Sequence, residues 1–226
     1  MGHQNKRAII IGGGIIGGAT AYFLNQKGWS VTILEKDRFG YGASHGNCGL
    51  VVPSHVFPLN SPENLIKGIG WMLKKNAPLF IRPRAKTSWS WWMIQFVRHC
   101  FGSHRQVSAA GRGALMTDAI SLYDTLIKTE GINCHWDTPG ACHLFHSKKE
   151  FTAFGATNHL EEQNGFKVKA LTGDSLYDLL PAITHEVVGM WHDQRVALLR
   201  PDTFMCELAS ILKNKGVEIV EQTEFT

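Results

Sequence analysis

Six residues near the start of the chain have types and spacing that suit phosphate binding. They are Gly12-Gly13-Gly14-Ile15-Ile16-Gly17, and they fit the pattern G-x-G-x-x-G. In this pattern the first glycine allows a sharp strand-to-helix turn, the second lets the backbone approach a phosphate, and the third lets the helix pack closely on the strand. The N-terminus of the helix offers amide groups and a partial positive charge. The spacing therefore predicts a site for the pyrophosphate of a dinucleotide.

Glu35 is the second group that such a site requires. It follows the apolar run Ser30–Leu34 at the spacing expected for an acid that binds the hydroxyls of a nucleotide ribose. An acid at this position, in place of a basic residue, disfavours a 2′-phosphate and therefore NADP. The fingerprint alone leaves NAD and FAD open. A glycine-rich turn with a purely structural role is the least favoured interpretation.

These groups need two strands and a helix to hold them. Ala8–Ile11 is a short β-branched run that is apolar on both faces, which predicts a buried parallel strand. A helix is expected from about Ile15 to Lys27, ended by Gly28. With Ser30–Leu34 as the second strand, the order predicts a βαβ unit.

The rest of the chain alternates between helices and short strands. Three helices come first, at Ser61 to Leu73, Ser88 to Cys100 and Val107 to Glu130. A mixed region follows, with strands at Ile132–Trp136 and Ala141–Phe145, a helix from Ser147 to about Gln163, and strands at Phe166–Leu171 and Val187–Trp191. The last elements are a helix from Pro201 to Gly216 and a strand at Val217–Val220. This order predicts a dinucleotide domain that is interrupted by a second, mixed domain and resumes near Val196.

The loop after the second strand narrows the choice of dinucleotide. Gly40 to Gly49 fits G-x-x-x-S-x-x-N-x-G, with Ser44 and Asn47 at the polar positions. It resembles the loop at this place in the FAD-dependent amino-acid oxidoreductase superfamily, which includes D-amino-acid oxidase, glycine oxidase, sarcosine oxidase and bacterial D-amino-acid dehydrogenase. There the loop runs beside the ribityl chain and the flavin ring. The resemblance implies FAD.

Further segments make the chain most similar to the bacterial D-amino-acid dehydrogenases. These segments are Asn47–Ser54, Trp71–Leu73 with Ala77–Pro83, the Trp-rich helix from Trp89 to Cys100, and Leu199–Val220. The resemblance covers nearly the whole chain, and the first fifty residues are its most specific part.

The resemblance implies a fold and a division into domains. The expected fold class is α/β, with a Rossmann-like βαβ domain of the glutathione-reductase type that binds FAD and is interrupted by an α+β substrate domain. The expected parts are residues 1–75 and 196–226 for the FAD-binding domain and 76–195 for the substrate domain. The expected cofactor-binding residues are Ile11, Gly12, Gly13, Gly14, Ile15, Ile16, Gly17, Glu35, Lys36, Ser44, Gly46, Asn47, Gly49 and Leu50.

The resemblance also implies an activity. It is the oxidative deamination of a D-amino acid to a 2-oxo acid, with hydride transfer to the flavin and electrons passed to a quinone-type acceptor. Two alternatives within the same chemistry are the oxidation of glycine or sarcosine and the oxidation of D-hydroxyproline. An alternative of another class is an FAD-binding fragment without turnover. Members of the superfamily extend well beyond Thr226, so we expect this sequence to be an N-terminal part and assign no catalytic residue.

A group of histidines and cysteines lies in the middle of the chain. It comprises Cys134, His135, Cys142, His143 and His146. Their spacing fits no zinc pattern, and alternation along two strands scatters the side chains over both faces. We therefore expect no metal site.

The stretch 67–112 is basic and rich in tryptophan. No Asp or Glu occurs between Glu63 and Asp118, whereas nine Lys and Arg do. One interpretation is a peripheral contact with an anionic membrane. The favoured alternative places Trp89 and Trp92 in the core and the cations on a solvated face, with Trp91 as the better surface candidate. No recognition motif accompanies the charges, so we expect no nucleic-acid binding.

Charge and cysteine usage indicate a location. The net charge is +4, and the five cysteines are odd in number and irregular in spacing, which favours reduced thiols in a cytoplasmic setting. No secretory signal or membrane-spanning run is evident. We expect a cytoplasmic protein, with the inner face of the cell membrane as the place of any peripheral contact.

Overall fold

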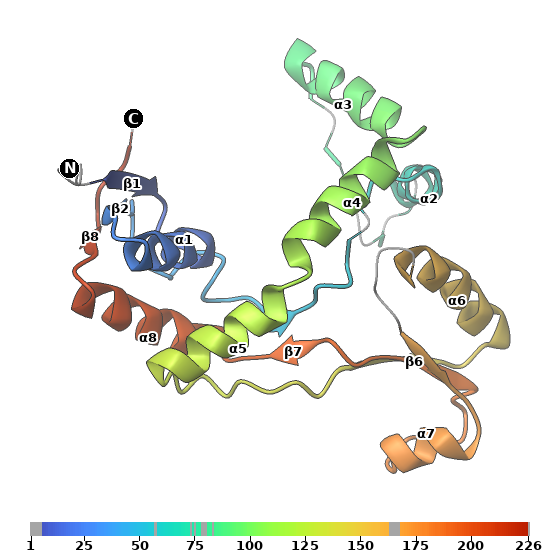
Figure 1. Ribbon diagram of the computed structural model, residues 1–226. Helices are drawn as coiled ribbons and strands as arrows, with labels where there is room; N and C mark the ends of the chain where they lie inside the picture. Colours follow the sequence, from blue (N-terminus) through green and yellow to red (C-terminus); the bar gives the residue numbers. More distant parts are fainter. Residues whose placement is uncertain are drawn as a thin grey trace. The chain divides into compact units, whose positions relative to one another are not determined.

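The computed structural model describes residues 6–56, 58–72, 74, 76–77, 81–82, 84–162 and 168–225. The chain forms two compact units (Figure 1). The first unit consists of Met1–Val51, Ile120–Gly140 and Val196–Thr226, and the second of Val52–Ala119 and Ala141–Arg195. Within the described residues, no helix has the length and apolar character needed to cross a bilayer.

The first unit contains the predicted βαβ arrangement. Its parallel sheet has the strand order β1-β2-β8, with β1 at Arg7–Ile11, β2 at Ser30–Leu34 and β8 at Glu218–Val220. Helix α1, Ile15–Gln26, joins β1 to β2, and helix α8, Pro201–Asn214, precedes β8. The α/β class and the Rossmann-like topology are therefore confirmed.

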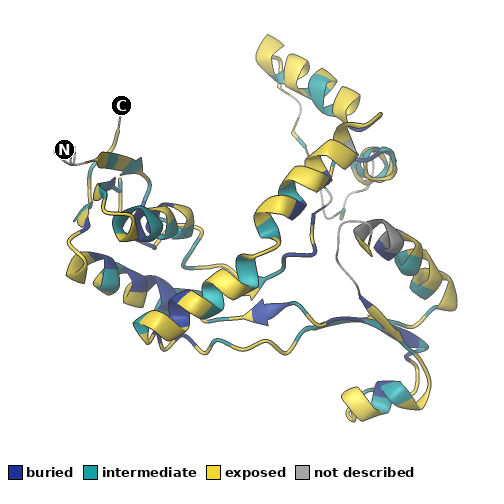
Figure 2. Cartoon of the chain, in the orientation of Figure 1, coloured by how far each residue is buried: buried dark blue, intermediate teal, exposed yellow. Residues whose placement is uncertain are grey.

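The core of the first unit lies on one face of this sheet. Val31 and Ile33 are buried there against Tyr22 of α1 and Leu208 of α8. Because both helices cover this face, the opposite face of β1 is open, with Ile9 69% and Ile11 56% exposed. The expectation of a strand buried on both faces was wrong for β1 (Figure 2).

Helix α5, Ala119–Glu130, adds Leu126 and Ile127 to the same core. We had expected one helix over Val107–Glu130, but the structure contains two, because α4, His104–Met116, ends before α5 begins. The interruption at residues 117–118 coincides with the passage from the second unit to the first.

The segment after α5 is not the strand that alternation predicted. Ile132 and Cys134 are buried, but the segment forms no regular ladder. Its contacts are single hydrogen bonds, such as the one from the Arg200 amide to the Cys134 carbonyl at 2.7 Å. Its partners are therefore the core and the start of α8.

A second, smaller sheet in the first unit was not predicted. Strands β3, Leu50–Val51, and β7, Ala197–Leu198, pair antiparallel, with Leu50 opposite Leu198. This pair fastens the end of the glycine-rich loop to the segment that leads into α8.

The second unit is a mixed structure around an antiparallel sheet. Its strand order is β4-β6-β5, with β4 at Ala141–Phe145, β6 at Gly189–Asp193 and β5 at Lys169–Leu171. Its remaining helices are α2 at Pro62–Met72, α3 at Thr87–His99, α6 at Lys148–Glu162 and α7 at Asp174–Leu179. Part of the predicted strand Phe166–Leu171, the end of the helix expected at Gln163, and Leu73 lie outside the described residues.

The tryptophans of α3 differ in exposure. Trp89 is half-buried, and Trp91, the predicted surface candidate, is 61% exposed. Trp92, which was expected in the core, is 57% exposed, and its ring stacks on Phe96 at 5.4 Å. The expectation that both Trp89 and Trp92 are buried was therefore wrong for Trp92.

The unit boundaries differ from the expected division 1–75, 76–195 and 196–226. Residues 52–75 cluster with the second unit, and Ile120–Gly140 clusters with the first. The second difference follows from burial, since Leu126, Ile127, Ile132 and Cys134 belong to the core beneath the parallel sheet. The assignment of a cofactor role or a substrate role to each part stays a prediction.

Candidate cofactor site

The glycine-rich turn connects β1 to α1 as the pattern predicts. Gly12 has φ +100°, and its amide donates to the Leu34 carbonyl at 2.8 Å, so the turn is tied to the end of β2. A Cβ on Gly17 would lie 2.0 Å from the Gly12 carbonyl oxygen. The first and last glycines of the motif are therefore required by the backbone itself.

Glu35 lies against the same turn. Its Oε2 accepts the Gly13 amide at 2.6 Å, and its Oε1 accepts the Asp37 amide at 2.9 Å. Each carboxylate oxygen keeps a further lone pair that suits a ribose hydroxyl donor. The structure thus brings the predicted acid and the predicted glycine turn together.

Ser44 stands at the N-terminus of α1. Its Oγ accepts the Ile15 amide at 2.9 Å and would lie 3.1 Å from a Cβ on Gly14. The hydroxyl proton is free to point outward, because the oxygen uses a lone pair for the Ile15 bond. Ser44 therefore adds a donor at the place where the helix amides attract an anion.

Asn47 organises the loop internally. Its side-chain amide donates to the Ser44 carbonyl at 2.9 Å, and its Oδ1 accepts the Gly49 amide at 2.7 Å. Gly49 has φ +69°, and a Cβ there would lie 2.0 Å from the Leu199 carbonyl oxygen. Since the Asn47 side chain is engaged within the loop, its role is to shape the loop around Ser44.

The other predicted residues lie around this group with varying exposure. Ile16 is 81% exposed on the first turn of α1, and Leu50 is 48% exposed at β3. Lys36 and Gly46 are exposed, and the Lys36 ammonium lies 3.9 Å from the Asp37 carboxylate. Ile11 ends β1 on the open face of the sheet. These side chains make no described polar contact with Glu35 or Ser44.

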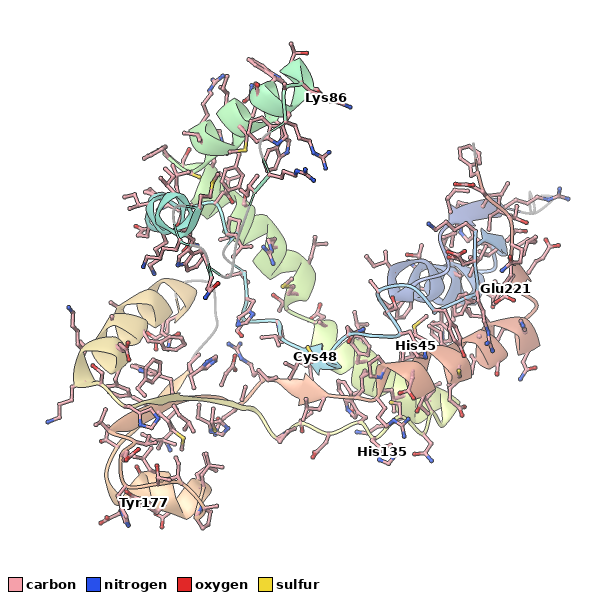
Figure 3. All side chains as sticks on the ribbon, turned by 180° about the vertical axis from the view of Figure 1, so that it is seen from behind. His45, Cys48, Lys86, His135, Tyr177 and Glu221 are labelled. Carbon is pink, nitrogen blue, oxygen red and sulfur yellow. The ribbon has the colours of Figure 1, made fainter. Side chains whose placement is uncertain are left out.

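A pocket of about 280 Å³ extends along the loop within the first unit. Its lining comes from α1, the loop, α5 and the start of α8, namely Ile15, Ser44, Asn47, Cys48, Gly49, Leu50, Val51, Tyr123, Leu199, Pro201, Phe204 and Met205. Small-molecule pockets span roughly 300–1,000 Å³, so this one suits part of a dinucleotide. Figure 3 shows His45 and Cys48 along the loop that forms its wall.

Tyr123 forms an aromatic wall of this pocket. Its ring stacks on Trp136 at a centroid distance of 5.7 Å and meets Phe204 at 5.6 Å. Burial raises the pKa of the Tyr123 hydroxyl, so it stays a neutral phenol at physiological pH.

Sequence reasoning missed Phe39 and Glu221. Phe39 is buried, and its ring would lie 2.9 Å from a Cβ on Gly13 and 3.0 Å from one on Gly18. Glu221, which follows β8 (Figure 3), accepts the Phe39 amide through Oε1 at 2.8 Å. An aromatic residue four positions after Glu35 was a visible signal for Phe39, whereas Glu221 reaches the site only through the parallel pairing of β2 with β8.

The group of histidines and cysteines does not assemble into a metal site in the described residues, where no three His, Cys, Asp or Glu side chains are placed to hold an ion. Cys134 and His135 belong to the first unit, whereas Cys142, His143 and His146 belong to the second. His143 packs against Phe154, and burial lowers its pKa.

The residues present fit FAD. Gly12 has a positive φ and Gly17 has no room for a side chain. The first-turn amides of α1 and the Ser44 hydroxyl suit the pyrophosphate, and Glu35 suits the ribose. The pocket that Ser44 lines also includes Cys48 and Leu199, so it offers room for part of the ligand beyond the pyrophosphate.

The parallel βαβ sheet, the glycine turn and the acid at the end of β2 define a dinucleotide-binding protein of the Rossmann-like class. The family described as FAD dependent oxidoreductase, or DAO, matches residues 7–226, and the chain belongs to this family. The family is FAD dependent, which confirms the predicted cofactor and the resemblance found in the sequence.

Solved structures share this fold at low sequence identity. Glycine oxidase from Bacillus cereus ATCC 14579 is 18% identical with a TM-score of 0.59, and the match covers 98% of this chain and 47% of that one. L-amino acid deaminase from Proteus vulgaris is 16% identical with a TM-score of 0.62, over 98% and 40% of the two chains. L-proline dehydrogenase from P. horikoshii is 18% identical with a TM-score of 0.61, over 100% and 46%. The chain thus spans less than half the length of these structures.

Proposed function

We propose that this chain contributes the FAD-binding part of an amino-acid dehydrogenase that deaminates a D-amino acid to a 2-oxo acid. The observation that carries the proposal is the family match over residues 7–226, together with the contact of Glu35 and Ser44 with the glycine-rich turn. When bound, FAD supplies the redox chemistry by accepting a hydride from the substrate α-carbon, and the resulting imino acid hydrolyses to the 2-oxo acid and ammonia.

The residues of this chain would bind and orient the cofactor. The α1 amides and Ser44 would bind the pyrophosphate, and Glu35 would bind the adenosine ribose. Asn47 and Gly49 would hold the loop beside the remaining part of the cofactor, and Tyr123 and Phe204 would exclude water from the pocket.

The names of the structural neighbours favour an amino-acid substrate. Glycine oxidase, L-amino acid deaminase and L-proline dehydrogenase are each named for an amino acid. The resemblance of Asn47–Ser54 and of the Trp-rich helix to bacterial D-amino-acid dehydrogenases favours the D-configuration and a quinone-type acceptor. Glycine- or sarcosine-type and D-hydroxyproline-type oxidation are the alternatives within the same chemistry.

The test is an anaerobic titration of the FAD-reconstituted chain, alone and in the presence of a polypeptide corresponding to the remaining half of its relatives. We expect D-alanine to bleach the flavin absorbance and L-alanine to leave it unchanged, and a quinone analogue to restore it. Bleaching by glycine, sarcosine or D-hydroxyproline alone would support an alternative substrate, and rapid peroxide formation in air would overturn the dehydrogenase assignment.

A second candidate is an FAD-binding protein without turnover. The observation that favours this candidate is that the chain covers only 40–48% of the structures of glycine oxidase and L-amino acid deaminase. Bound FAD that no amino acid bleaches, with or without the second polypeptide, would support this candidate and contradict the first.

A further inference from the structure

The second unit contains a cavity of about 290 Å³ at the margin of its antiparallel sheet. Its lining comes from β5, the end of β6 and α7, namely Lys169, Leu171, Ser175, Asp178, Leu179, His192 and Gln194. All of these residues belong to the second unit, so that unit forms the cavity by itself. None of them is a predicted cofactor-binding residue, and the ligand of the cavity has to be inferred from its own side chains.

The sheet supplies a polar row to this cavity. His192 of β6 lies opposite Lys169 of β5, and Met190 lies opposite Leu171 in the same ladder. Because residues two apart on a strand share a face, these four side chains project from the same side of the sheet. Met190 is fully buried against Leu176 of α7. The face therefore changes from an apolar row that packs on α7 to a polar row that lines the cavity.

Helix α7, whose Tyr177 is labelled in Figure 3, supplies the opposite wall. Ser175, Asp178 and Leu179 have the i, i+3, i+4 spacing of one helix face. The Ser175 hydroxyl donates to the Thr172 carbonyl at 2.8 Å, so its oxygen keeps a lone pair for a donor. This wall thus offers a carboxylate, a hydroxyl acceptor and an apolar side chain.

The polar groups of the cavity lack partners within the described part of the chain. His192 is only 8% exposed, yet its ring forms no hydrogen bond with any described residue. The Lys169 ammonium and the Asp178 carboxylate likewise form no ion pair there. Buried polar groups are nearly always hydrogen-bonded, because a buried group without a partner destabilises the fold. A ligand that supplies these partners would therefore be bound favourably.

We propose that this cavity binds a free α-amino acid with a small apolar side chain. The ligand carboxylate pairs with Lys169 and His192, and the ligand ammonium pairs with Asp178. The ligand side chain lies against Leu171 and Leu179. A cation and a carboxylate in one small cavity select a molecule that carries both charges, since each pair forms a charge-assisted hydrogen bond. The proposal rests on the second unit alone and does not depend on the proposed redox function.

Other small ligands fit the cavity less well. A volume of about 290 Å³ lies at the lower end of the roughly 300–1,000 Å³ found for small-molecule pockets, which is too small for a nucleotide. The Asp178 carboxylate opposes a phosphate dianion. A metal ion is opposed by Lys169, and within the described part of the chain no three His, Cys, Asp or Glu side chains are placed to hold one.

A polypeptide is the remaining occupant to weigh. Strand β5 is at the edge of its sheet, and a segment from the remaining half of the relatives' length could pair with it through its backbone. Backbone pairing at that edge gives no reason for unpaired Lys169, Asp178 and His192 side chains around a cavity. An amino acid accounts for all three.

The test is isothermal titration of the full, FAD-loaded chain with α-methylleucine. This amino acid has no α-hydrogen, so hydride transfer to a flavin cannot consume it. We expect saturable binding. Two analogues, 4-methylpentanoate and 3-methylbutylamine, each keep only one of the two charges and should bind about tenfold more weakly or worse, because one charge-assisted hydrogen bond is lost.

Variants locate the binding in this cavity. Lys169→Met and Asp178→Asn should each raise the Kd for α-methylleucine about tenfold or more. Lys149→Met on α6 and Asp174→Asn on α7 are matched controls, because both side chains are exposed and neither lines the cavity. Their Kd should equal that of the unchanged chain. All four replaced side chains are exposed, so circular dichroism should show an intact fold in each variant.

Four results would overturn the proposal. These are no saturable heat, equal Kd values for α-methylleucine and a singly charged analogue, equal losses in the controls and the cavity variants, and loss of binding when a polypeptide corresponding to the remaining half of the relatives is added. Binding that Ser44→Ala weakens while Lys169→Met leaves it unchanged would place the ligand at the cofactor site and would also contradict the proposal. Failure of D-alanine to bleach the flavin, with α-methylleucine binding intact, would contradict only the proposed redox function.

Discussion

The Ser44 hydroxyl oxygen accepts the Ile15 amide at 2.9 Å, which joins the loop after β2 to the first turn of the helix after β1. The two residues are 29 positions apart in the sequence. The contact places a hydroxyl at the positive end of α1, where the helix amides and the Ser44 hydroxyl could both donate to a bound anion.

Replacement of Ser44 by alanine should therefore weaken FAD binding. Loss of one hydrogen bond to a charged phosphate corresponds to about a tenfold rise in Kd, with the fold intact. Quenching of flavin fluorescence during titration measures the Kd. Ser210→Ala is the matched control, because the Ser210 hydroxyl donates to the Cys206 carbonyl within α8, away from the pocket. An unchanged Kd for Ser44→Ala would contradict the role assigned to Ser44.

Replacement of Glu35 by glutamine should reduce the preference for FAD over FMN about tenfold, because a charged acceptor for the ribose hydroxyls is lost. FMN lacks the adenosine ribose, so its affinity should stay nearly constant. Isothermal titration with both ligands gives the ratio. Glu218→Gln is the control, since that carboxylate accepts the Thr32 hydroxyl on the exposed part of the sheet. Equal losses for FAD and FMN would indicate that Glu35 acts only by holding the Gly13 turn.

Replacement of Gly17 by alanine should destabilise the first unit by at least about 2 kcal/mol, because the new Cβ would lie against the Gly12 carbonyl and force α1 away from β1. A Cβ on Gly17 would be 2.0 Å from that oxygen, whereas one on Gly42 would have no neighbour within 4 Å. Urea unfolding followed by circular dichroism measures both variants. Gly42→Ala should be close to neutral, and a Gly17→Ala variant of equal stability would refute the close approach.

The stability of the first unit should decrease above about pH 10 through Tyr22. Burial, and then the hydrogen bond to Glu130 at 2.5 Å, raise the pKa of Tyr22 to about 12. Because this pKa is higher in the folded than in the unfolded state, the stabilisation is complete below about pH 10 and is lost as the pH rises to about 12. Absorbance titration of the phenolate and unfolding at a series of pH values measure the effect.

Two variants test the origin of that pH dependence. Tyr22→Phe should flatten the decrease above pH 10, and Tyr177→Phe in the second unit should leave it unchanged. Glu130→Gln should move the pKa of Tyr22 back toward 10, since the carboxylate that opposes phenolate formation is gone. A steep alkaline decrease that persists in Tyr22→Phe would assign the effect to another group.

The stability of the first unit should also decrease at acidic pH, through Glu130. Burial raises its pKa, but the hydrogen bonds from Tyr22 and Lys215 outweigh burial and lower the pKa below its usual value of 4.5. Its contribution to stability is therefore present above about pH 4.5 and is lost as the pH falls through the lowered pKa. Lys215→Met should reduce this acid sensitivity, as measured by unfolding between neutral and acidic pH.

Much of the cofactor site was predictable because its determinants are local. Gly12 to Gly17 and Glu35 follow from strand, turn and helix periodicities within thirty residues, and the structure joins them through the Gly13 amide. Glu221 was missed because its contact depends on the pairing of β2 with β8, in which Thr32 and Glu218 lie opposite each other although they are 186 residues apart in the sequence. Long-range pairing leaves no periodic signal in a short window.

Errors in the predicted elements have the same physical origin. The helix expected over residues 107–130 is interrupted because its two halves bury their apolar faces in different units, a choice that periodicity alone does not record. Ile9 and Ile11 were expected to be buried on the strength of their types, but α1 and α8 cover only the opposite face. Side-chain type sets a preference for burial, and the arrangement of neighbouring elements decides whether it is met.

The sequence by itself determined the nucleotide-binding turn and the acid that follows β2, because both are defined by residue types at fixed short spacing. The choice of FAD came from the resemblance of the Gly40–Gly49 loop to a known family. The tertiary structure alone decided that Ser44 accepts a hydrogen bond from the first turn of α1, that Asn47 shapes the loop, and that Trp92 is exposed. Those facts depend on which surfaces meet when distant segments pack, and packing is a property of the folded chain as a whole.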